Sequence, residues 1–378
     1  MGTFIPFNKP YLSGNELKYI KLAIAGGKIS GDGVYTGKCH EFFEKRFGFL
    51  KCLLTTSCTD ALEMAAILIN IQPGDEVIMP SFTFVSTANA FVLRGAKIVF
   101  ADSKADHPGM DEDNLENLVT KKTKAIVTVH YAGIACDMHK IMTLADKYNL
   151  FVIEDAAQAI DSYYTFPDGT IKALGSIGHL AAFSFHETKN IISGEGGMIV
   201  INDEQFTERA EIIREKGTNR SKFFRGEIDK YGWVDIGSSF LPSDIIAAFL
   251  YAQLENFDKI QEKRKEISSY YAKSLVDAKG ISFLPIPGYA TDNAHMFPII
   301  CESIDKRSQL IRTLKENNVM ATFHYQSLHN SPYFSRQYPG IMLPNSEKFA
   351  DRLMRLPMYY ELEKAQLEFI SNLILHAI

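Results

Sequence analysis

The sequence predicts an α/β fold, with a large domain built on a mostly parallel sheet and a smaller α+β domain after it. Length is the first observation, because 378 residues exceed what one hydrophobic core usually serves. Alternation is the second: between residues 51 and 155, short apolar strands alternate with helices, which is typical of a parallel sheet covered on both faces. The third is a change after about residue 171, where short strands and glycine turns replace the alternation.

An N-terminal arm precedes the alternating region. It is expected to contain a helix over 16–27, a glycine-punctuated loop from Ser30 to Gly37 and an amphipathic helix over 40–48. The alternating region predicts strands at 51–56, 76–80, 97–102, 125–131 and 150–155. Helices are predicted between them at 60–70, 83–95, 111–119 and 137–149.

The rest of the chain is expected to finish the sheet and then to build the smaller domain. Strands are predicted at 179–186 and 196–202, followed by a helix over 204–217 and a polar segment over 218–233. A helical run from about 242 to 279 would bridge two domains, 1–245 and 246–378. Strands at 295–302 and 320–326, a helix over 306–318 and two terminal helices complete the smaller unit.

Composition excludes several classes of function. Apolar residues make up 46% of the chain and charged residues 22%, and a net charge of -5 without a basic block argues against nucleic-acid binding. Five cysteines without a C-x-x-C pair, and ten histidines without an H-E-x-x-H helix, indicate neither disulfides nor a metal site. The stretch MGTFIPFNKPYLSG is not expected to act as a signal peptide, because Pro and Lys interrupt it, and no later run approaches the roughly 18 apolar residues of a membrane span. A cytoplasmic protein that binds small molecules is therefore expected.

Asp155 is the first candidate for chemistry. It follows the apolar strand LFVIE, at the carboxyl end where open α/β sheets bind their ligands. Its carboxylate could face a cofactor, or it could cap a helix over AAQAI.

Lys189 is the second candidate. It stands in FSFHETKN, after an apolar strand and before the glycine turn SGEGG. Packing near protein would lower the pKa of its amine, and a neutral amine can form an imine with an aldehyde. Most lysines are simply solvated, but an Asp and then a Lys on successive strand ends favours a functional pair.

Several segments resemble the DegT/DnrJ-type sugar aminotransferases: TSCTDAL, PSFTFVSTANAF, EDAAQ, and SFHETKN with the following GEGG. The resemblance runs from residue 5 to the C-terminus. The segments NRSKFFRG, DIGSS and NAHMF are similar to those of family members that aminate dTDP-4-dehydro-6-deoxyglucose. The family implies the PLP-dependent transferase fold of the aspartate aminotransferase type (fold type I), the cofactor pyridoxal 5'-phosphate (PLP) and a homodimer with active sites at the interface.

The resemblance also implies roles for individual residues. Asp155 would keep the pyridine nitrogen of PLP protonated, and Gln158 would lie beside the phenolic oxygen. Lys189 would hold the cofactor aldehyde and then move the proton between substrate and cofactor. Phe84 matches the aromatic residue that covers the PLP ring, although burial habits alone would place such a ring in the core.

Two segments are candidates for binding the cofactor phosphate. Ser57, Cys58 and Thr59 end a strand and open a helix, whose first N–H groups favour anions. The alternative is an ordinary helix start, because Asp60 with Glu63 resembles a capping pair. Ser184 is a second candidate, since strand alternation places it opposite its phenylalanine neighbours.

Substrate contacts are expected from histidines, a tyrosine and arginines. His186 could face the cofactor or pack in its own loop. His324, Tyr325 and His329 are expected to reach toward the sugar nucleotide. Arg220 and Arg225 could grip a diphosphate or the carboxylate of glutamate, because guanidinium pairs with both. Many relatives bind the phosphate with an asparagine of the neighbouring subunit, and here Ser239 stands in its place.

Three other functions fit the sequence less well. GDGVYTG, from Gly31 to Gly37, has the wrong spacing for a dinucleotide-binding loop and follows a helix, which argues against a nicotinamide oxidoreductase. A non-catalytic sensor or binding module that keeps the PLP fold could lose the lysine. Within the family, a histidine in place of the lysine marks sugar dehydratases. Lys189 argues against both.

The expected reaction is transamination of a nucleotide-linked keto sugar. L-Glutamate would donate its amino group, giving 2-oxoglutarate and the pyridoxamine form of the cofactor. That form would aminate dTDP-4-dehydro-6-deoxy-D-glucose to dTDP-4-amino-4,6-dideoxy-D-galactose for cell-surface glycan synthesis. The alternatives keep this chemistry but give the gluco epimer or act on a 3-keto sugar.

Overall fold

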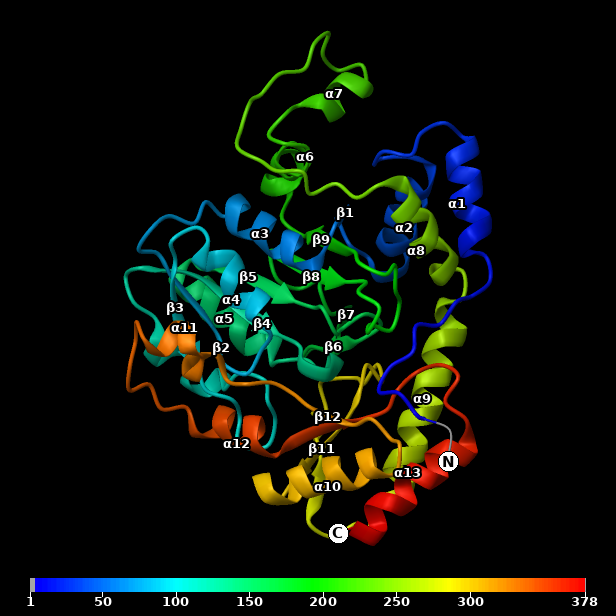
Figure 1. The fold of residues 1–378 in the computed structure, drawn as a ribbon. Coiled ribbons are helices and arrows are strands. Elements are labelled where there is room, and N and C mark those ends of the chain that lie inside the picture. Colours follow the sequence, from blue (N-terminus) through cyan, green and yellow to red (C-terminus); the bar gives the residue numbers. More distant parts are fainter. Residues whose placement is uncertain (1–3, 378) are drawn as a thin grey trace.

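The computed structural model describes residues 4–377. Its centre is a seven-stranded sheet in which β8 pairs in parallel with β5, β5 with β4, β4 with β2 and β2 with β3. Only β9 runs antiparallel to its neighbours, β1 and β8 (Figure 1). Because the other four pairings are parallel, the prediction of a mostly parallel sheet is confirmed. The strands, in spatial order, are β1 (Lys51–Thr55), β9 (Gly197–Ile201), β8 (Leu180–Ser184), β5 (Phe151–Asp155), β4 (Thr123–Val129), β2 (Glu76–Pro80) and β3 (Lys97–Ala101).

Helices cover both faces of this sheet. Neighbouring strand residues enter different cores: Val152 joins the cluster that includes residues of α2, α5 and α8, whereas Ile153 joins the cluster with α3, α4 and α6. Because both faces are buried, the strands are almost continuously apolar. The covering helices are α2 (Val34–Phe47), α3 (Cys58–Leu68), α4 (Val85–Val92), α5 (Met138–Tyr148), α6 (Thr207–Arg214) and α8 (Asp244–Leu254).

The N-terminal arm begins its second helix earlier than predicted. Helix α1 (Glu16–Ala25) matches its prediction, but α2 starts at Val34 instead of residue 40. The reason is a distant carboxylate: Asp244 accepts hydrogen bonds from the N–H groups of Tyr35 (3.3 Å) and Thr36 (2.8 Å), and from the Thr36 hydroxyl (2.8 Å). A Cβ at Gly33 would lie only 2.4 Å from Asp244, so glycine permits this close approach.

We expect Asp244→Ala to lower the free energy of unfolding by about 2–4 kcal/mol, because it leaves two N–H groups and one hydroxyl of α2 without their acceptor. Asp244 is only 1% exposed, so water cannot easily replace it. Thermal or denaturant unfolding measures the change. Asp258→Ala is the control, since Asp258 forms an ion pair with Arg46 at the surface. Its substitution should change the free energy of unfolding little. Equal stability of the two variants would contradict this account.

The predicted helical run over 242–279 is two helices, α8 and α9 (Phe257–Ser274). Phe257 and Ile260 of α9 pack in a core of the large domain, whereas Ile267 and Tyr271 pack in the core of the small domain. Helix α9 therefore connects the domains, as Figure 1 shows. The division at residues 245 and 246 stays a prediction.

The small domain is a four-stranded antiparallel sheet with helices. Its strands, in spatial order, are β10 (Ile281–Phe283), β11 (Phe297–Cys301), β13 (Leu353–Leu356) and β12 (Thr322–Phe323). Helices α10 (Ile304–Glu316) and α13 (Lys364–Ala377) pack with α9 in its core. Strand β13 lies where only terminal helices were predicted, and the strand predicted at 320–326 keeps two residues.

Shorter elements complete the chain. Residues 111–119 form a 3₁₀ helix, η1 (Glu112–Leu118), instead of the predicted α-helix. The remaining elements are β6 (Tyr163–Thr165), β7 (Ile171–Ala173), α7 (Arg220–Phe224), α11 (Pro332–Ser335), α12 (Pro344–Arg352), η2 (Tyr131–Gly133), η3 (Glu204–Phe206) and η4 (Leu328–Asn330). Across residues 4–377, every helix is too short or too polar to span a bilayer.

Candidate active site

A cavity of about 620 Å³ lies at the carboxyl ends of β5 and β8, between the two domains. This is where open α/β sheets bind their ligands. Most of the predicted site residues line it together: Ser57, Cys58, Thr59, Phe84, Asp155, Gln158, Ser184, His186, Lys189, His324 and Tyr325.

Asp155 is the last residue of β5 and is only 7% exposed. The Thr87 hydroxyl donates to its Oδ2 (2.7 Å), and the Ala157 N–H donates to its Oδ1 (3.2 Å). Burial raises the pKa of Asp155, while these two hydrogen bonds and the charge of Lys189 act in the opposite direction. The residues after Asp155 form turns, so the helix-cap alternative is wrong. This carboxylate would be stabilised by a cation placed in the cavity.

Lys189 lies in the loop between β8 and β9. Its N–H donates to the His186 carbonyl (2.9 Å), and the side chain of the next residue, Asn190, is fixed by Gln261 of α9 (2.8 Å) and by His295 (2.8 Å). Burial lowers the pKa of Lys189, while Cys58 and Asp155 act to raise it. An amine with a lowered pKa is more often neutral and thus a better nucleophile.

The start of α3 forms another part of the wall. Ser57 is the N-cap, and its hydroxyl accepts the N–H of Asp60 (3.1 Å). Cys58 and Thr59 open the first turn, whose N–H groups make no intrahelical bond. A Cβ at Gly197 would lie 2.3 Å from the Ser57 backbone, so the glycine lets β9 pack against this helix start. A capped helix start and a phosphate-binding segment are therefore compatible, because Ser57 caps a helix whose N-terminus faces the cavity.

Gln158 has a fixed orientation. Its Oε1 accepts the Ala132 N–H (2.7 Å), and its Nε2 donates to the Tyr325 hydroxyl (3.2 Å). His324 shares a hydrogen bond with the Tyr131 hydroxyl (3.0 Å), and burial lowers the pKa of His324 well below its ordinary value. His324 and Tyr325 thus form the cavity wall on the side of the small domain. The lowered pKa favours a neutral His324 imidazole.

Phe84 is 55% exposed although it is a large apolar side chain beside the cavity. Its ring centre lies 6.1 Å from that of Tyr325, which leaves an apolar face accessible. At the end of β8, the Ser184 hydroxyl accepts a hydrogen bond from the His186 N–H (3.4 Å). His186 bonds to the Thr188 hydroxyl (2.9 Å) and also lines the cavity, so both alternatives for this residue stay open.

His329 does not reach the cavity, and its prediction is corrected. It is 2% exposed, with Nδ1 bonded to the Ser81 hydroxyl (2.7 Å) and Nε2 to Glu347 (3.0 Å). Both ring nitrogens are used, because the 3₁₀ turn η4 directs the side chain into the protein.

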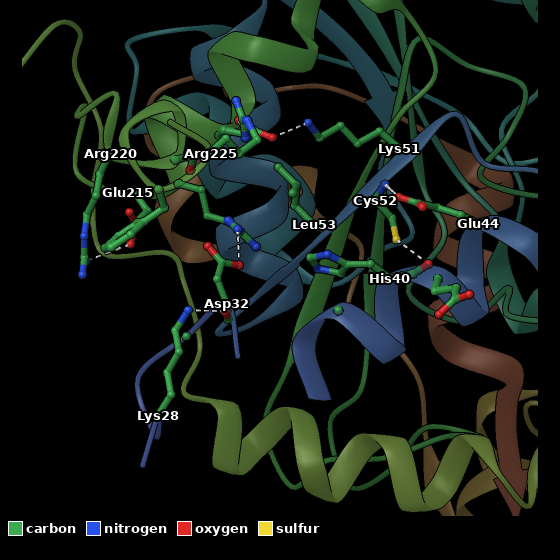
Figure 2. A pocket seen from close by; sticks show the side chains of 17 residues that line it. Lys28, Asp32, His40, Glu44, Lys51, Cys52, Leu53, Glu215, Arg220 and Arg225 are labelled. Atoms are coloured by element: carbon green, nitrogen blue, oxygen red, sulfur yellow. Dashed lines mark hydrogen bonds and ion pairs between the residues drawn. The ribbon is translucent and has the colours of Figure 1, made fainter. Parts of the chain in front are cut away.

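Arg220 and Arg225 lie outside this cavity within the single chain. They line a separate cavity of about 420 Å³, shown in Figure 2. Arg220 pairs with Glu215 (3.5 Å), and Arg225 pairs with Glu211 (2.9 Å). Ser239 is exposed, and its backbone forms an isolated antiparallel β-bridge with that of Glu215. Their roles toward substrate or a neighbouring subunit stay predictions.

Sequence reasoning missed several cavity residues. Thr87 orients Asp155, and Arg264, His295 and Arg355 reach the cavity from α9 and the small domain. No local signal marks them, because each depends on tertiary contacts. Within residues 4–377, no group of three or more histidine, cysteine or acidic side chains is arranged to hold a metal ion.

Comparisons with known proteins agree on one family. The model of the DegT/DnrJ/EryC1/StrS aminotransferase family matches residues 10–374. The spore coat polysaccharide biosynthesis protein SpsC of Bacillus subtilis is 33% identical over 372 residues, covering 94% of this chain and 92% of SpsC.

Solved structures show the same fold. PseC of Helicobacter pylori, an aminotransferase of pseudoaminic acid biosynthesis, superposes with a TM-score of 0.91 at 25% identity, covering 99% of each chain. Spr1654 of Streptococcus pneumoniae in its PMP form has a TM-score of 0.90 at 24% identity, covering 99% of this chain and 98% of Spr1654. The fold prediction, of the aspartate aminotransferase type, is thereby confirmed.

Proposed function

The chain belongs to the DegT/DnrJ/EryC1/StrS aminotransferase family and is a PLP-dependent transaminase, and from this premise we propose that it aminates dTDP-4-dehydro-6-deoxy-D-glucose. L-Glutamate is the proposed donor, and dTDP-4-amino-4,6-dideoxy-D-galactose the product. One observation supports the proposal most: Asp155, at the end of β5, and Lys189, in the loop that follows the neighbouring strand β8, line one cavity.

The side chains of the cavity fit PLP. Lys189 supplies an amine whose pKa burial lowers, and Asp155 supplies a buried carboxylate for a protonated ring nitrogen. The N-terminus of α3 offers N–H groups and the Thr59 hydroxyl to a phosphate, and Ser184 lies at the adjacent strand end. The accessible face of Phe84 suits a planar ring, and the Gln158 amide can lie beside the phenolic oxygen.

Bound PLP withdraws electrons from the substrate carbon and so acidifies its proton. Asp155 holds the proton on the ring nitrogen, and the Thr87 hydroxyl keeps Asp155 oriented for this. Lys189 removes the proton from the donor α-carbon and later returns one at sugar C4. Phe84 and Tyr325 line the cavity beside these groups.

Sequence segments support the keto-sugar assignment. NRSKFFRG, DIGSS and NAHMF are similar to those of enzymes that act on this dTDP sugar, and His295 and Met296 of NAHMF line the cavity. SpsC takes part in spore coat polysaccharide biosynthesis, and PseC takes part in pseudoaminic acid biosynthesis. We therefore propose that the product feeds surface glycan synthesis. The five cysteines are free thiols, which agrees with a proposed cytoplasmic location.

A homodimer is part of the proposal. The arm and the segment around α7, which projects from the body in Figure 1, expose large apolar side chains. Trp233 is 81% exposed, and Leu17, Val34 and Phe224 are similarly accessible. Apolar side chains exposed in such number usually mark an interaction surface. Through this surface, Arg220, Arg225 and Ser239 could serve the neighbouring subunit's site.

The substrate assignment is tested by incubating the PLP-loaded enzyme with L-glutamate and dTDP-4-dehydro-6-deoxy-D-glucose and examining the product by NMR. We expect 2-oxoglutarate and a sugar with an axial amine at C4, recognised by a small coupling between H3 and H4. A dTDP-3-keto-6-deoxy sugar serves as the comparison and should react much more slowly. An equatorial C4 amine, or preference for the 3-keto sugar, would contradict the assignment while keeping the transamination.

A further inference from the structure

A separate cavity of about 450 Å³ lies in the small domain, beside the wall of the active site. The segment 323–327 contributes to both cavities: His324 and Tyr325 line the active site, whereas Phe323 and Gln326 line the small-domain cavity. Helices α10 and α12 supply most of the remaining wall, at the end of the molecule opposite α7 in Figure 1. The two cavities have no lining residue in common, so the second one is a distinct site.

The small-domain cavity contains hydrogen-bonding groups that the protein does not use. Arg307 of α10 donates from Nη1 to the Ala350 carbonyl (2.7 Å), while its buried Nε has no acceptor within residues 4–377. The hydroxyl of Ser327, a residue that is 3% exposed, has no partner in that part of the chain either. Polar groups that are withdrawn from water without partners cost free energy, and a polar ligand in the cavity would lower this cost.

Hydrogen-bond acceptors come from the neighbouring helix. Glu347 and Asp351 are one turn apart on α12, and both line the cavity. Oε1 of Glu347 is hydrogen-bonded to His329 (3.0 Å) and Asn330 (3.4 Å), whereas the Asp351 carboxylate has no ion pair or hydrogen bond within the described residues. Arg307 pairs with neither acid, so the cavity holds donors and acceptors that are separate from one another.

An accessible aromatic ring completes the cavity. Phe323 is 52% exposed and lines the cavity together with Ile304 of α10, which is also exposed. Exposed apolar side chains beside unpaired polar groups suit a ligand that is amphipathic. A sugar ring has this character, because its C–H groups form an apolar face and its hydroxyl groups lie around the edge.

The charges of the lining also restrict the ligand. An anion would be attracted by Arg307 but repelled by Glu347 and Asp351, and a cation would meet the reverse conflict. An uncharged sugar avoids both, because each hydroxyl can donate to a carboxylate and accept from a guanidinium or amide N–H. Gln326 supplies such an amide, and the cavity volume lies within the range of roughly 300–1,000 Å³ that is usual for small-molecule sites.

We propose that the small-domain cavity binds an uncharged sugar, either a free monosaccharide or the end of a glycan chain. Arg307, Gln326 and Asp351 bind its hydroxyl groups, and Phe323 packs against the C–H face of its ring. This sugar is distinct from the keto sugar of the active site, because none of these residues lines the cavity that contains Lys189.

Saturation-transfer difference NMR of the PLP-loaded enzyme tests the site. The probes are D-galactose, N-acetyl-D-glucosamine and the β-1,4-linked disaccharide of N-acetyl-D-glucosamine, with excess dTDP-glucose, which has no keto group, occupying the active site. We expect saturable binding with an apparent Kd of about 0.1–10 mM. Preference for the disaccharide would assign the end of a glycan chain, whereas equal or stronger binding of a monosaccharide would assign a free sugar; both results support the site.

Matched variants locate the binding. We expect Asp351→Ala and Phe323→Ala each to raise the apparent Kd at least about fivefold, because one removes a hydrogen-bond acceptor and the other the aromatic face. Phe323→Tyr keeps the ring and should keep the affinity. Asp305→Ala and Phe369→Ala are the controls, since these side chains are exposed and outside the cavity, and they should bind as the wild type does. Unchanged melting temperatures show that the variants are folded.

Four results would overturn the inference. They are absence of saturable binding by every sugar probe, loss of the signal when dTDP-glucose is added, equal affinities of the wild type and both cavity variants, and preferential binding of glycine betaine, a zwitterion without a free amine. The second result would place the sugar in the active site, and the fourth would assign the cavity to a charged ligand. Transamination is not measured in these experiments, so its outcome and theirs are distinguishable.

Discussion

Lys189→Ala is expected to lower kcat by more than about 10⁴-fold, the largest effect of any single substitution. The cavity wall contains no second lysine among residues 4–377, so no neighbouring amine can replace it. The variant loses both the covalent attachment of the cofactor and the group that moves the proton, and general acid–base catalysis alone contributes about 10²–10⁴-fold.

The measurement is the steady-state rate at saturating PLP, L-glutamate and keto sugar, with the absorption spectrum of each protein recorded beside it. Lys172→Ala is the control, since Lys172 is exposed on β7 and does not line the cavity. It should keep the wild-type rate. A Lys189→Ala variant within about tenfold of the wild type would exclude Lys189 as the catalytic base.

Asp155→Asn should have the second largest effect, a loss of about 10²–10⁴-fold in kcat. The substitution keeps the size of the side chain but removes the charge that stabilises a protonated ring nitrogen. Thr87→Val should lower the rate about tenfold, because it removes only the hydrogen bond that orients the carboxylate.

Kinetics and cofactor titration of both variants measure these effects. PLP should bind more weakly to Asp155→Asn, whereas the exposed-turn variant Asp168→Asn should equal the wild type in both respects. If Asp155→Asn kept the wild-type rate, Asp155 would be a structural residue only.

Much of the site could be predicted from the sequence because it follows from strand geometry. Apolar strands end where polar side chains begin, and parallel strands bring these ends to one edge. Asp155 at the end of β5 and Ser184 at the end of β8 were therefore identifiable, and Lys189 was identifiable from the glycine turn that follows it.

The remaining features depend on contacts between distant segments. The start of α2 is set by Asp244, more than two hundred residues away along the chain, so local patterns placed it too late. His329 was expected at the substrate, but it is buried and its two ring nitrogens are hydrogen-bonded to Ser81 and Glu347. Arg355 was missed because LMRL forms a short strand inside a region predicted as terminal helices.

The most direct test of the central claim is the absorption spectrum of the purified protein after addition of PLP, then L-glutamate, then dTDP-4-dehydro-6-deoxy-D-glucose. Our account predicts a visible band that is absent from Lys189→Ala, is lost with glutamate and returns with the keto sugar. A protein that develops no such band with PLP, or whose band does not respond to any amino donor, would contradict the assignment of this cavity as a transaminase active site.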